Sequence, residues 1–453
     1  MKRFGSRSLG KILSIVMLKS LFLSLSVLLI AVGLYAQGNS GGKSGGVSAA
    51  LQITRVLPDY YNAYLDPIVE EIVLLKKKEA DGFFYWTDTH FPENSGYASA
   101  IIEYVQETIG PVKIFFGGDA TKNAPSLSPG IEMFTASCLQ AGSHGMFYPV
   151  RGNHDFTSTT SESELEPQTM DNKAVYEYLS SLCGADVIRD ENVPASNYYY
   201  LDSAKGRLRY VVFDTTDNVV DGKIQYGISD RQMDWIFNHA VSTLPNGWKL
   251  IFISHVPLDS GHFNYEAITK AGDKIAALAP DGNILLCLAG HRHSDMESGI
   301  GAIFQVLTES DCLVDCARTH TPYSLQTEPK RQGTVSEQTL DYVSISKNRR
   351  TVTFKRVGHG YDRIFNVRPI DVKTGTRVKL PRVAGNSPLW TIYNADIFSI
   401  GPYDEAGLRK MQIDTDGIIM LDSNHVYCEK SGNYIAVALK KDGSRHFFML
   451  NAR

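Results

Sequence analysis

The chain has 453 residues, of which 43% are hydrophobic and 21% charged, and its formal net charge is −4. This composition predicts a folded globular protein that is long enough for one large domain plus an additional segment. The acidic balance argues against a nucleic-acid-binding protein and against a protein held to anionic lipid by charge. If the substrate is an anion, local positive charge at the site must attract it.

Residues 1–36 have the pattern of a secretory signal peptide. Five basic and no acidic residues are followed by the apolar stretch SLFLSLSVLLIAVGL (20–34), which is short for a bilayer span, and by Ala36 before a Gly/Ser stretch. We therefore expect a secreted or periplasmic protein with no membrane span after signal removal. An uncleaved membrane anchor is the alternative. Cleavage leaves 40 basic and 49 acidic residues, a net charge of −9.

Helix-like and strand-like segments then alternate along the chain. The periodicity predicts helices over 66–82, 97–109, 131–141 and 229–241, and buried strands over 82–87, 112–116, 145–150, 209–215, 249–254 and 283–289. Strands that alternate with helices predict an α/β fold with a mostly parallel sheet whose faces are covered.

The second half of the chain changes character. Residues 310–336 are polar and irregular, which predicts a long loop, and 340–346 with 350–357 form an expected hairpin. After residue 365, short alternating runs separated by turn residues predict a small β-rich, Ig-like sandwich. The expected organisation is a signal peptide (1–36), a Gly/Ser leader with an N-terminal helix (37–81), a main domain (82–365) and a C-terminal β-rich domain (366–453).

Side chains that can bind metal follow five of the expected strands. These residues are Asp88 and His90, Asp119, Asn153, His255, and finally His291 and His293. The carboxyl ends of parallel strands lie along one edge of a sheet, so we expect these side chains to converge. Seven nitrogen and oxygen ligands are too many for one zinc ion, but they suit two divalent ions that share a bridging carboxylate.

Two such ions would give the site a defined chemistry. Two aspartates against two divalent ions leave a formal charge of +2, which attracts an anion. A water between ions about 3.5–4 Å apart is deprotonated near neutral pH and can attack an electrophile, while the ions hold the charge that develops in an in-line displacement. Phosphate esters fit this geometry best. By themselves D-x-H and GGD carry almost no information and GNHD and GHRH are moderately informative, but the ordered set is a strong indication.

The ordered motifs D-x-H, GD, GNHD, H and GHRH resemble those of the calcineurin-like metallophosphoesterase superfamily, over about residues 82–365. The resemblance implies a two-sheet α/β/β/α sandwich. It would place Asp88, His90 and His293 on one metal, Asn153, His255 and His291 on the other, and Asp119 between them. His154 would meet the substrate, protonating the leaving oxygen or steadying the phosphoryl charge, and Asp155 would orient His154.

Some positions depart from the family or stay open. Lys122 stands where the family often has Asp or Tyr, and the missing tyrosine argues against the iron–zinc site of purple acid phosphatases. Lys122, Arg151 and His262 are candidates for substrate contacts, with a plain surface position as the alternative for each. The segment RVGHGYDR (356–363) has no assignment.

The sequence thus predicts an exported metal-dependent phosphoric ester hydrolase, a phosphatase or a phosphodiesterase. Its cofactors would be two divalent ions (Mn, Zn or Fe), and its substrate a phosphorylated small molecule or another phosphoester. The alternative is a catalytically silent scaffold of the same family that recognises a surface or glycan partner. The oligomeric state is left open.

Overall fold

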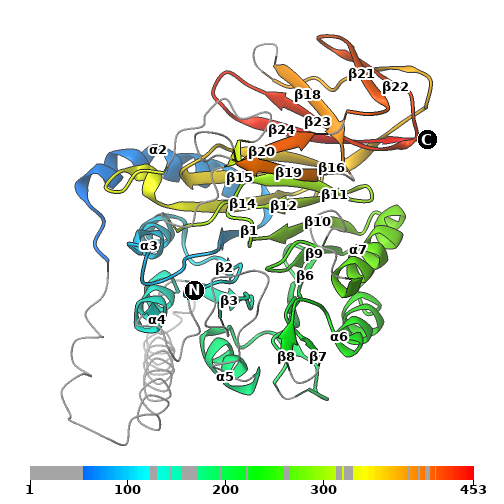
Figure 1. Cartoon of the computed structure of the whole chain (residues 1–453). Coiled ribbons are helices and arrows are strands. Elements are labelled where there is room, and N and C mark those ends of the chain that lie inside the picture. Colours follow the sequence, from blue (N-terminus) through cyan, green and yellow to red (C-terminus); the bar gives the residue numbers. More distant parts are fainter. Residues whose placement is uncertain are drawn as a thin grey trace, which may run out of the picture. The chain divides into compact units, whose positions relative to one another are not determined.

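The computed structural model describes residues 55–122, 130–142, 145–155, 172–193, 195–220, 223–258, 266–312, 319–320, 330–384, 388–395, 398–403, 409–413 and 415–453 (Figure 1). The chain divides into two units, 1–52 and 53–453, and every described residue belongs to the second. The expected signal peptide and most of the leader therefore lie outside the described residues. Within the described part, no helix is both long enough and apolar enough to cross a membrane.

The larger main sheet has nine strands and combines early and late parts of the chain. Its order is β18 (Leu389–Asn394), β23 (Gly432–Leu439), β24 (Arg445–Ala452), β16 (Arg363–Val372), β15 (Thr351–Gly358), β14 (Thr339–Ser346), β1 (Glu79–Trp86), β2 (Lys113–Phe116) and β3 (Met146–Pro149). Strands β1, β2 and β3 are parallel. Strands β14 and β15 form the hairpin that the sequence predicts.

The second main sheet has seven strands. Its order is β11 (Met296–Ile300), β12 (Ile303–Leu307), β10 (Ile284–Ala289), β9 (Lys249–Ile253), β6 (Leu208–Val212), β5 (Tyr199–Ser203) and β4 (Ile188–Arg189). Strands β6, β9, β10 and β12 are parallel. All six residues of β10 are buried, as expected for a parallel strand that is covered on both faces.

Helices cover the outer face of each main sheet. Against the nine-stranded sheet pack α2 (Asp59–Lys76), α3 (Tyr97–Ile109), α4 (Gly130–Ala141) and α5 (Asn172–Leu182), and against the seven-stranded sheet α6 (Asp230–Trp235), the π-helix Ile236–Val241 and α7 (Glu266–Leu278). The layers are therefore helix, sheet, sheet and helix, which confirms the α/β/β/α sandwich. The first helix differs from its predicted bounds of 66–82, because β1 already begins at Glu79.

Shorter elements complete the described part. They are the hairpin β7 (Asn218–Val220) with β8 (Lys223–Gln225), the small sheet of β13 (Thr319–His320), β20 (Arg409–Ile413) and β19 (Phe398–Tyr403), and the 3-10 helices Ala279–Asp281 and Val335–Glu337. Most of the predicted loop 310–336 lies outside the described residues.

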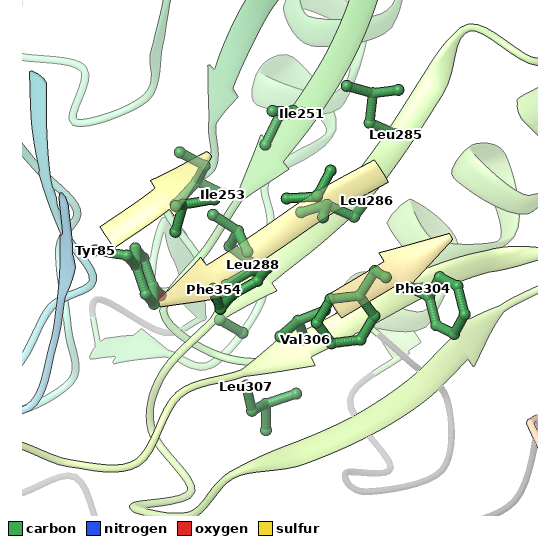
Figure 2. Packing of buried hydrophobic residues seen from close by; sticks show 14 of the residues in the cluster. Tyr85, Ile251, Ile253, Leu285, Leu286, Leu288, Phe304, Val306, Leu307 and Phe354 are labelled. Atoms are coloured by element: carbon green, nitrogen blue, oxygen red, sulfur yellow. The ribbon is translucent and has the colours of Figure 1, made fainter. Parts of the chain in front are cut away.

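Apolar side chains between the two main sheets form the largest core (Figure 2). Tyr85 of β1 and Phe354 of β15 come from the nine-stranded sheet, whereas Ile253, Leu288 and Val306 come from the seven-stranded sheet. All five are fully buried. Burial of this apolar surface holds the sheets face to face, so loops from both sheets can contribute to one site.

The C-terminal segment is β-rich, as predicted, and it continues the nine-stranded sheet. Strand β16 crosses the expected boundary at residue 365 and pairs antiparallel with β15 and parallel with β24. A small sheet of β17 (Arg377–Lys379), β22 (His425–Cys428) and β21 (Ile418–Asp422) shares a second core with β18, β23 and β24. The segment thus forms a small sandwich, one layer of which is the end of the main sheet.

A substitution at Phe365 can test whether residues 82–365 and 366–453 unfold together. Its ring stacks on Phe447 of β24, with centroids 4.6 Å apart, and packs edge-on against Phe304 and Phe354. We expect Phe365→Ala to lower the free energy of unfolding by about 3–5 kcal/mol, because it leaves a cavity between the sheets. Urea unfolding followed by tryptophan fluorescence and circular dichroism measures this change.

The matched control is Leu389→Ala, because Leu389 is 63% exposed on β18. Its effect should stay within about 0.5 kcal/mol. Two separate unfolding transitions, of which Phe365→Ala moves only one, would show that residues 366–453 fold as an independent domain.

Candidate metal centre

The seven predicted ligands lie together at the carboxyl ends of the parallel strands. Asp88 and His90 follow β1, Asp119 follows β2, Asn153 follows β3, His255 follows β9, and His291 and His293 follow β10. Both main sheets therefore contribute. The carboxylate and imidazole groups form two sets, Asp88, His90, Asp119 and His293 in one and Asp119, His255 and His291 in the other, and the candidate ligand atoms of each set lie within 4.8 Å of one another.

The first set has the spacing of ligands around one ion. The Nε2 atoms of His90 and His293 are 3.0 Å apart, and His293 Nε2 is 3.3 Å from Asp88 Oδ1. Two ligands about 2.0–2.2 Å from a metal at angles of about 90–110° are separated by about 3.0–3.4 Å. This set therefore fits a divalent cation.

The second set has the same spacing and includes an amide oxygen. His255 Nε2 lies 3.1 Å from Asp119 Oδ2 and 3.0 Å from Asn153 Oδ1, which is also 2.9 Å from His291 Nδ1. Asp119 Oδ2 is in addition 3.7 Å from His90 Nε2. The carboxylate of Asp119 thus faces both sets, and it is the group that can bridge them.

The backbone at these ligands is unusual. Seven non-glycine residues of the described part have positive φ, and five of them are Asp88, His90, Asp119, His291 and His293, with φ between 46° and 67°. A left-handed conformation is uncommon for such residues, and strained backbone gathers where a site demands it. The turns after β1, β2 and β10 therefore hold their ligands by a backbone conformation that the fold imposes.

Two glycines make close approach possible between loops of the site. A Cβ on Gly118, which has φ of +103°, would collide with the ring of His255. A Cβ on Gly152 would collide with the amide nitrogen and the carboxylate of Asp119. The loops after β2, β3 and β9 can therefore pack this closely only because these positions lack side chains.

Hydrogen bonds outside the two sets orient the ligands. His255 Nδ1 lies 2.8 Å from the carbonyl oxygen of Gly117, so Nδ1–H donates there and Nε2 is left to face the ligand cluster. The hydroxyl of Thr87 donates to Asp88 Oδ2 at 2.6 Å, and the backbone N–H of His291 donates to the same carboxylate. These contacts fix the direction of the lone pairs.

Burial and the neighbouring rings set the charge of the cluster. Burial would raise the pKa of Asp88 and Asp119, but the surrounding imidazoles hold the pKa of both carboxyls below the ordinary value. Burial opposes charge on His255, yet Asp119 raises the pKa of that imidazole to about 9. Burial lowers the pKa of His90 and His291. At neutral pH the site therefore presents two carboxylates, and a cation that binds there displaces a proton from His255.

His154 lies beside the first set. Its backbone N–H donates to Asp119 Oδ1 at 2.8 Å, and its ring Nδ1 is 2.8 Å from the carbonyl oxygen of Lys122. The ring centroid is 4.9 Å from that of His90, and the side chain is half-buried. With Nδ1 turned to a carbonyl, Nε2 is the nitrogen available to a bound molecule.

Asp155 has a different place from the one expected. Its carboxylate accepts backbone N–H groups of Gly152 at 2.7 Å, Ala120 at 2.8 Å and Asp119 at 3.3 Å, and none of its contacts is to the ring of His154. It therefore ties the loop after β3 to the loop after β2, and the carbonyl of Lys122 orients His154 instead. Burial, with the charge of Asp119, raises the pKa of Asp155 to about 6.

The three candidates for substrate contacts have different outcomes. The ammonium of Lys122 is partly exposed and pairs with Glu93 at 2.7 Å. Arg151 is not a surface charge: it is 1% exposed and donates to Asp214 at 3.1 Å. A buried guanidinium needs such a partner, and the surface position considered as the alternative for this residue is wrong. His262 lies outside the described residues.

A network of ion pairs lies next to the loop of the last ligand, His293, and the sequence did not predict it. The network includes residues of the segment RVGHGYDR, which had no assignment. Arg356 donates to both carboxylate oxygens of Asp295, at 2.9 and 2.7 Å, and through Nε to Asp341 at 2.9 Å. Arg363 donates to the other oxygen of Asp341 at 2.9 Å. Asp295 follows His293 by two residues, so this network ties the loop of His293 to strands β14, β15 and β16.

Only part of this missed set left a signal in the sequence. Asp295 lies in the loop after β10 that also holds His291 and His293, so the strand-end pattern could have included it. Nothing in the sequence separates the buried Arg356 and Arg363 from surface arginines of a hairpin.

Comparison with known proteins agrees with the geometry. The model of the calcineurin-like phosphoesterase family matches residues 86–295, which contain all seven ligands and His154. No curated protein matches the chain.

Solved structures with some similarity include three proteins. The phosphopantetheinyl hydrolase of Mycobacterium tuberculosis has 13% identity and a TM-score of 0.31, with 51% of this chain and 90% of that one covered. GAP50, the anchor in the inner membrane complex of Plasmodium, has 11% identity and a TM-score of 0.35, with 60% and 84% covered. A protein serine/threonine phosphatase of Saccharomyces cerevisiae has 12% identity and a TM-score of 0.26, with 67% and 91% covered.

These structural similarities are too low for us to draw any conclusion about activity from them. The family match stands on its own, because it spans the strands and loops that supply the ligands. Residues 86–295 are therefore identified as a calcineurin-like phosphoesterase domain.

Proposed function

We propose that this protein is an exported phosphoester hydrolase that works with two divalent metal ions. The observation that carries the proposal is the position of Asp119, whose carboxylate belongs to two adjacent sets of ligands. A single structural ion needs about four ligands and no shared carboxylate. The seven side chains at this edge are best explained by two neighbouring ions with Asp119 between them.

Each ion would have its own group of side chains. Asp88, His90 and His293 would hold one ion, Asn153, His255 and His291 the other, and Asp119 would bridge them. When bound, the ions would supply an activated water and stabilise charge on the phosphoryl oxygens. Manganese, zinc and iron all accept this mixture of imidazole and oxygen ligands.

His154 would act on the leaving group. Its Nδ1–H donates to the carbonyl of Lys122, so the ring is held with Nε2 directed away from that carbonyl. A proton on Nε2 can pass to the ester oxygen as the bond to phosphorus breaks, which removes the cost of expelling an alkoxide. Its backbone bond to Asp119 keeps the ring next to the proposed bridge.

The proposed substrate is a phosphorylated small molecule or another phosphoester, as a monoester or a diester. Export is proposed from residues 1–36 alone, whose basic start, apolar stretch and Ala36 are typical of a cleaved signal. A secreted or periplasmic enzyme would meet substrates outside the cytoplasm. Two assay substrates separate these reaction types: p-nitrophenyl phosphate is a monoester, and bis-p-nitrophenyl phosphate is a diester.

The first prediction separates metal binding from proton transfer. His154→Ala should keep its bound metals and lose about 10²–10⁴-fold in kcat, because it removes the proposed acid but none of the ligands. Asp119→Asn should lose metal and activity together, because the neutral amide cannot bridge two cations. Mass spectrometry of bound metals and hydrolysis of both p-nitrophenyl esters give the two readouts.

A matched control is His239→Ala, which removes an exposed histidine of the π-helix and should leave both readouts unchanged. Bound metals without turnover of either ester in the wild-type protein would favour the silent scaffold. A wild-type protein that takes up no metal would rule out the proposed function.

The second prediction concerns pH. Because Asp119 raises the pKa of His255 to about 9, a metal ion must displace a proton from this ring at neutral pH. The apparent affinity for Mn²⁺ should therefore rise by up to about tenfold for each pH unit between pH 6.5 and 8.5. Calorimetric titration of metal-stripped protein in buffers of different ionisation enthalpy measures both affinity and proton release. An affinity that does not change with pH would contradict the prediction.

The third prediction tests Asp155 as a positioning residue. An amide in Asp155→Asn has one oxygen instead of two to accept the backbone N–H groups of Gly152 and Ala120. The loop of Asp119 should loosen, and metal affinity should fall by about 10–100-fold. Excess Mn²⁺ should restore kcat, which would not happen if Asp155 took part in the chemistry. Asp186→Asn, which changes an aspartate paired with Tyr148, is the control.

A further inference from the structure

Three short basic segments meet at the opposite ends of the strands from the metal centre. Residues 76–78 (KKK) precede β1, residues 205–207 (KGR) join β5 to β6, and residues 347–350 (KNRR) join β14 to β15. The backbone N–H of Lys347 donates to the carbonyl of Lys78 at 3.1 Å, which brings two of these segments into contact. They come from both main sheets and are far apart in the sequence.

A cavity of about 350 Å³ lies between the two basic turns. Its lining includes four cationic side chains, Lys205, Arg207, Lys347 and Arg349, and one acidic side chain, Glu79. Arg207 and Arg349 are also the two remaining non-glycine residues of the described part with positive φ, 51° and 55°. Strained backbone of this kind, outside the metal centre, therefore occurs only here within the described residues.

The acidic side chains near this cavity already accept hydrogen bonds from neighbouring groups of the protein. Glu79 accepts the hydroxyls of Tyr342 at 3.0 Å and Ser344 at 3.0 Å. Asp81 accepts Lys113 and Tyr210 at 3.0 and 2.8 Å. Glu79 and Asp81 thus bind other groups of the protein, and neither forms an ion pair with the four cationic side chains of the cavity.

Of the four cationic side chains, Arg349 donates to the carbonyl oxygen of Gly247 at 3.0 Å. Within the described residues, the side chains of Lys205, Arg207 and Lys347 make no ion pair, and all three residues are exposed. Burial lowers the pKa of Lys76, the charge of Glu79 opposes this shift, and the charge of Lys205 adds to it. Burial and the charge of Arg349 likewise lower the pKa of Lys249. The cations therefore repel one another, and a bound anion would relieve that repulsion.

This edge is separate from the metal centre. Strand β1 runs from Glu79, at the cavity, to Trp86, two residues before Asp88. Eight residues at about 3.3 Å each place the two sites roughly 23–26 Å apart. A small phosphoester bound at the metals cannot reach the basic cavity, so the cations there have no role in the proposed hydrolysis.

We propose that this cavity is a second binding site, which takes a polyvalent phosphate-bearing anion. Arginine and lysine are the side chains that hold phosphate oxygens, by paired hydrogen bonds and by charge. Four cations around one small cavity suit a ligand with several negative charges close together, either a soluble oligophosphate or clustered phosphates of an anionic lipid surface. The site holds this ligand without acting on it, because it contains none of the metal-binding side chains.

The test uses the full chain with its metals and inorganic tripolyphosphate as the probe. The triple variant Lys205→Gln, Arg207→Gln and Lys347→Gln removes three charges from the cavity. The control variant Lys373→Gln, Arg382→Gln and Lys441→Gln removes three exposed charges from the C-terminal segment. Titration calorimetry at low salt compares both with the wild type, and hydrolysis of p-nitrophenyl phosphate is measured alongside.

The affinity of the cavity variant for tripolyphosphate should fall by about tenfold or more, because each cation near a phosphate group contributes to binding. The control should stay within about twofold of the wild type, and both variants should keep their hydrolytic rate. Binding should weaken as salt screens the charges. Equal affinity of both variants, or parallel loss of binding and hydrolysis, would overturn the proposal.

A second arm identifies the source of the phosphate. Wild-type protein is sedimented with vesicles of phosphatidylglycerol and, separately, of phosphatidylcholine. Sedimentation with phosphatidylglycerol alone, abolished in the cavity variant, assigns the site to anionic lipid. Tripolyphosphate binding without sedimentation assigns it to a soluble oligophosphate. If the wild type binds neither probe at the cavity, the proposal is wrong.

Discussion

The geometry of the site depends on a single buried carboxylate. Asp119 stands at the end of β2, between loops from both main sheets, and its oxygens face His255, His90 and the backbone N–H of His154. Burying this charge would be unfavourable without the imidazoles around it, and the imidazoles would repel one another if protonated without it. Metal binding, the pKa of His255 and the position of His154 therefore all depend on one group. The sandwich core matters because it brings the second sheet close enough to supply His255.

Much of the fold and most of the site could be predicted from the sequence. Buried parallel strands are apolar along their whole length, so a polar residue directly after such a run is informative, and Asp88, Asp119 and His255 were found in this way. Contacts between residues that only the folded chain brings together could not be predicted from the sequence. Asp155 acts on backbone N–H groups, and Arg151 is buried against Asp214, so neither role leaves a local pattern. The boundary at residue 365 rests on the change to short alternating runs separated by turn residues, and this pattern does not reveal that β16 pairs across it.

The two ends of the parallel strands differ in backbone conformation and in charge. At the carboxyl ends of the strands, left-handed turns aim carboxylates and imidazoles inward, and the surrounding protein shields them from water. At the amino ends, Glu79 and Asp81 are half-buried and hydrogen-bonded, whereas Lys205, Arg207 and Lys347 are exposed. An acidic protein can therefore present a positively charged region made of its own side chains, and metal ions held by Asp88 and Asp119 would add a second one.

The parallel pairing of β16 with β24 has a consequence for how the protein is made. These strands are neighbours in the sheet, yet about 80 residues separate their pairing partners, such as Arg363 and Arg445. Strand β16 also carries Arg363, which anchors the network behind His293. Strand β24 lies between β16 and β23 in the sheet, so β16 cannot complete its pairing until the segment about 80 residues later has been synthesised. Assembly of the central sheet is a late event that awaits distant segments, a topology associated with slow folding.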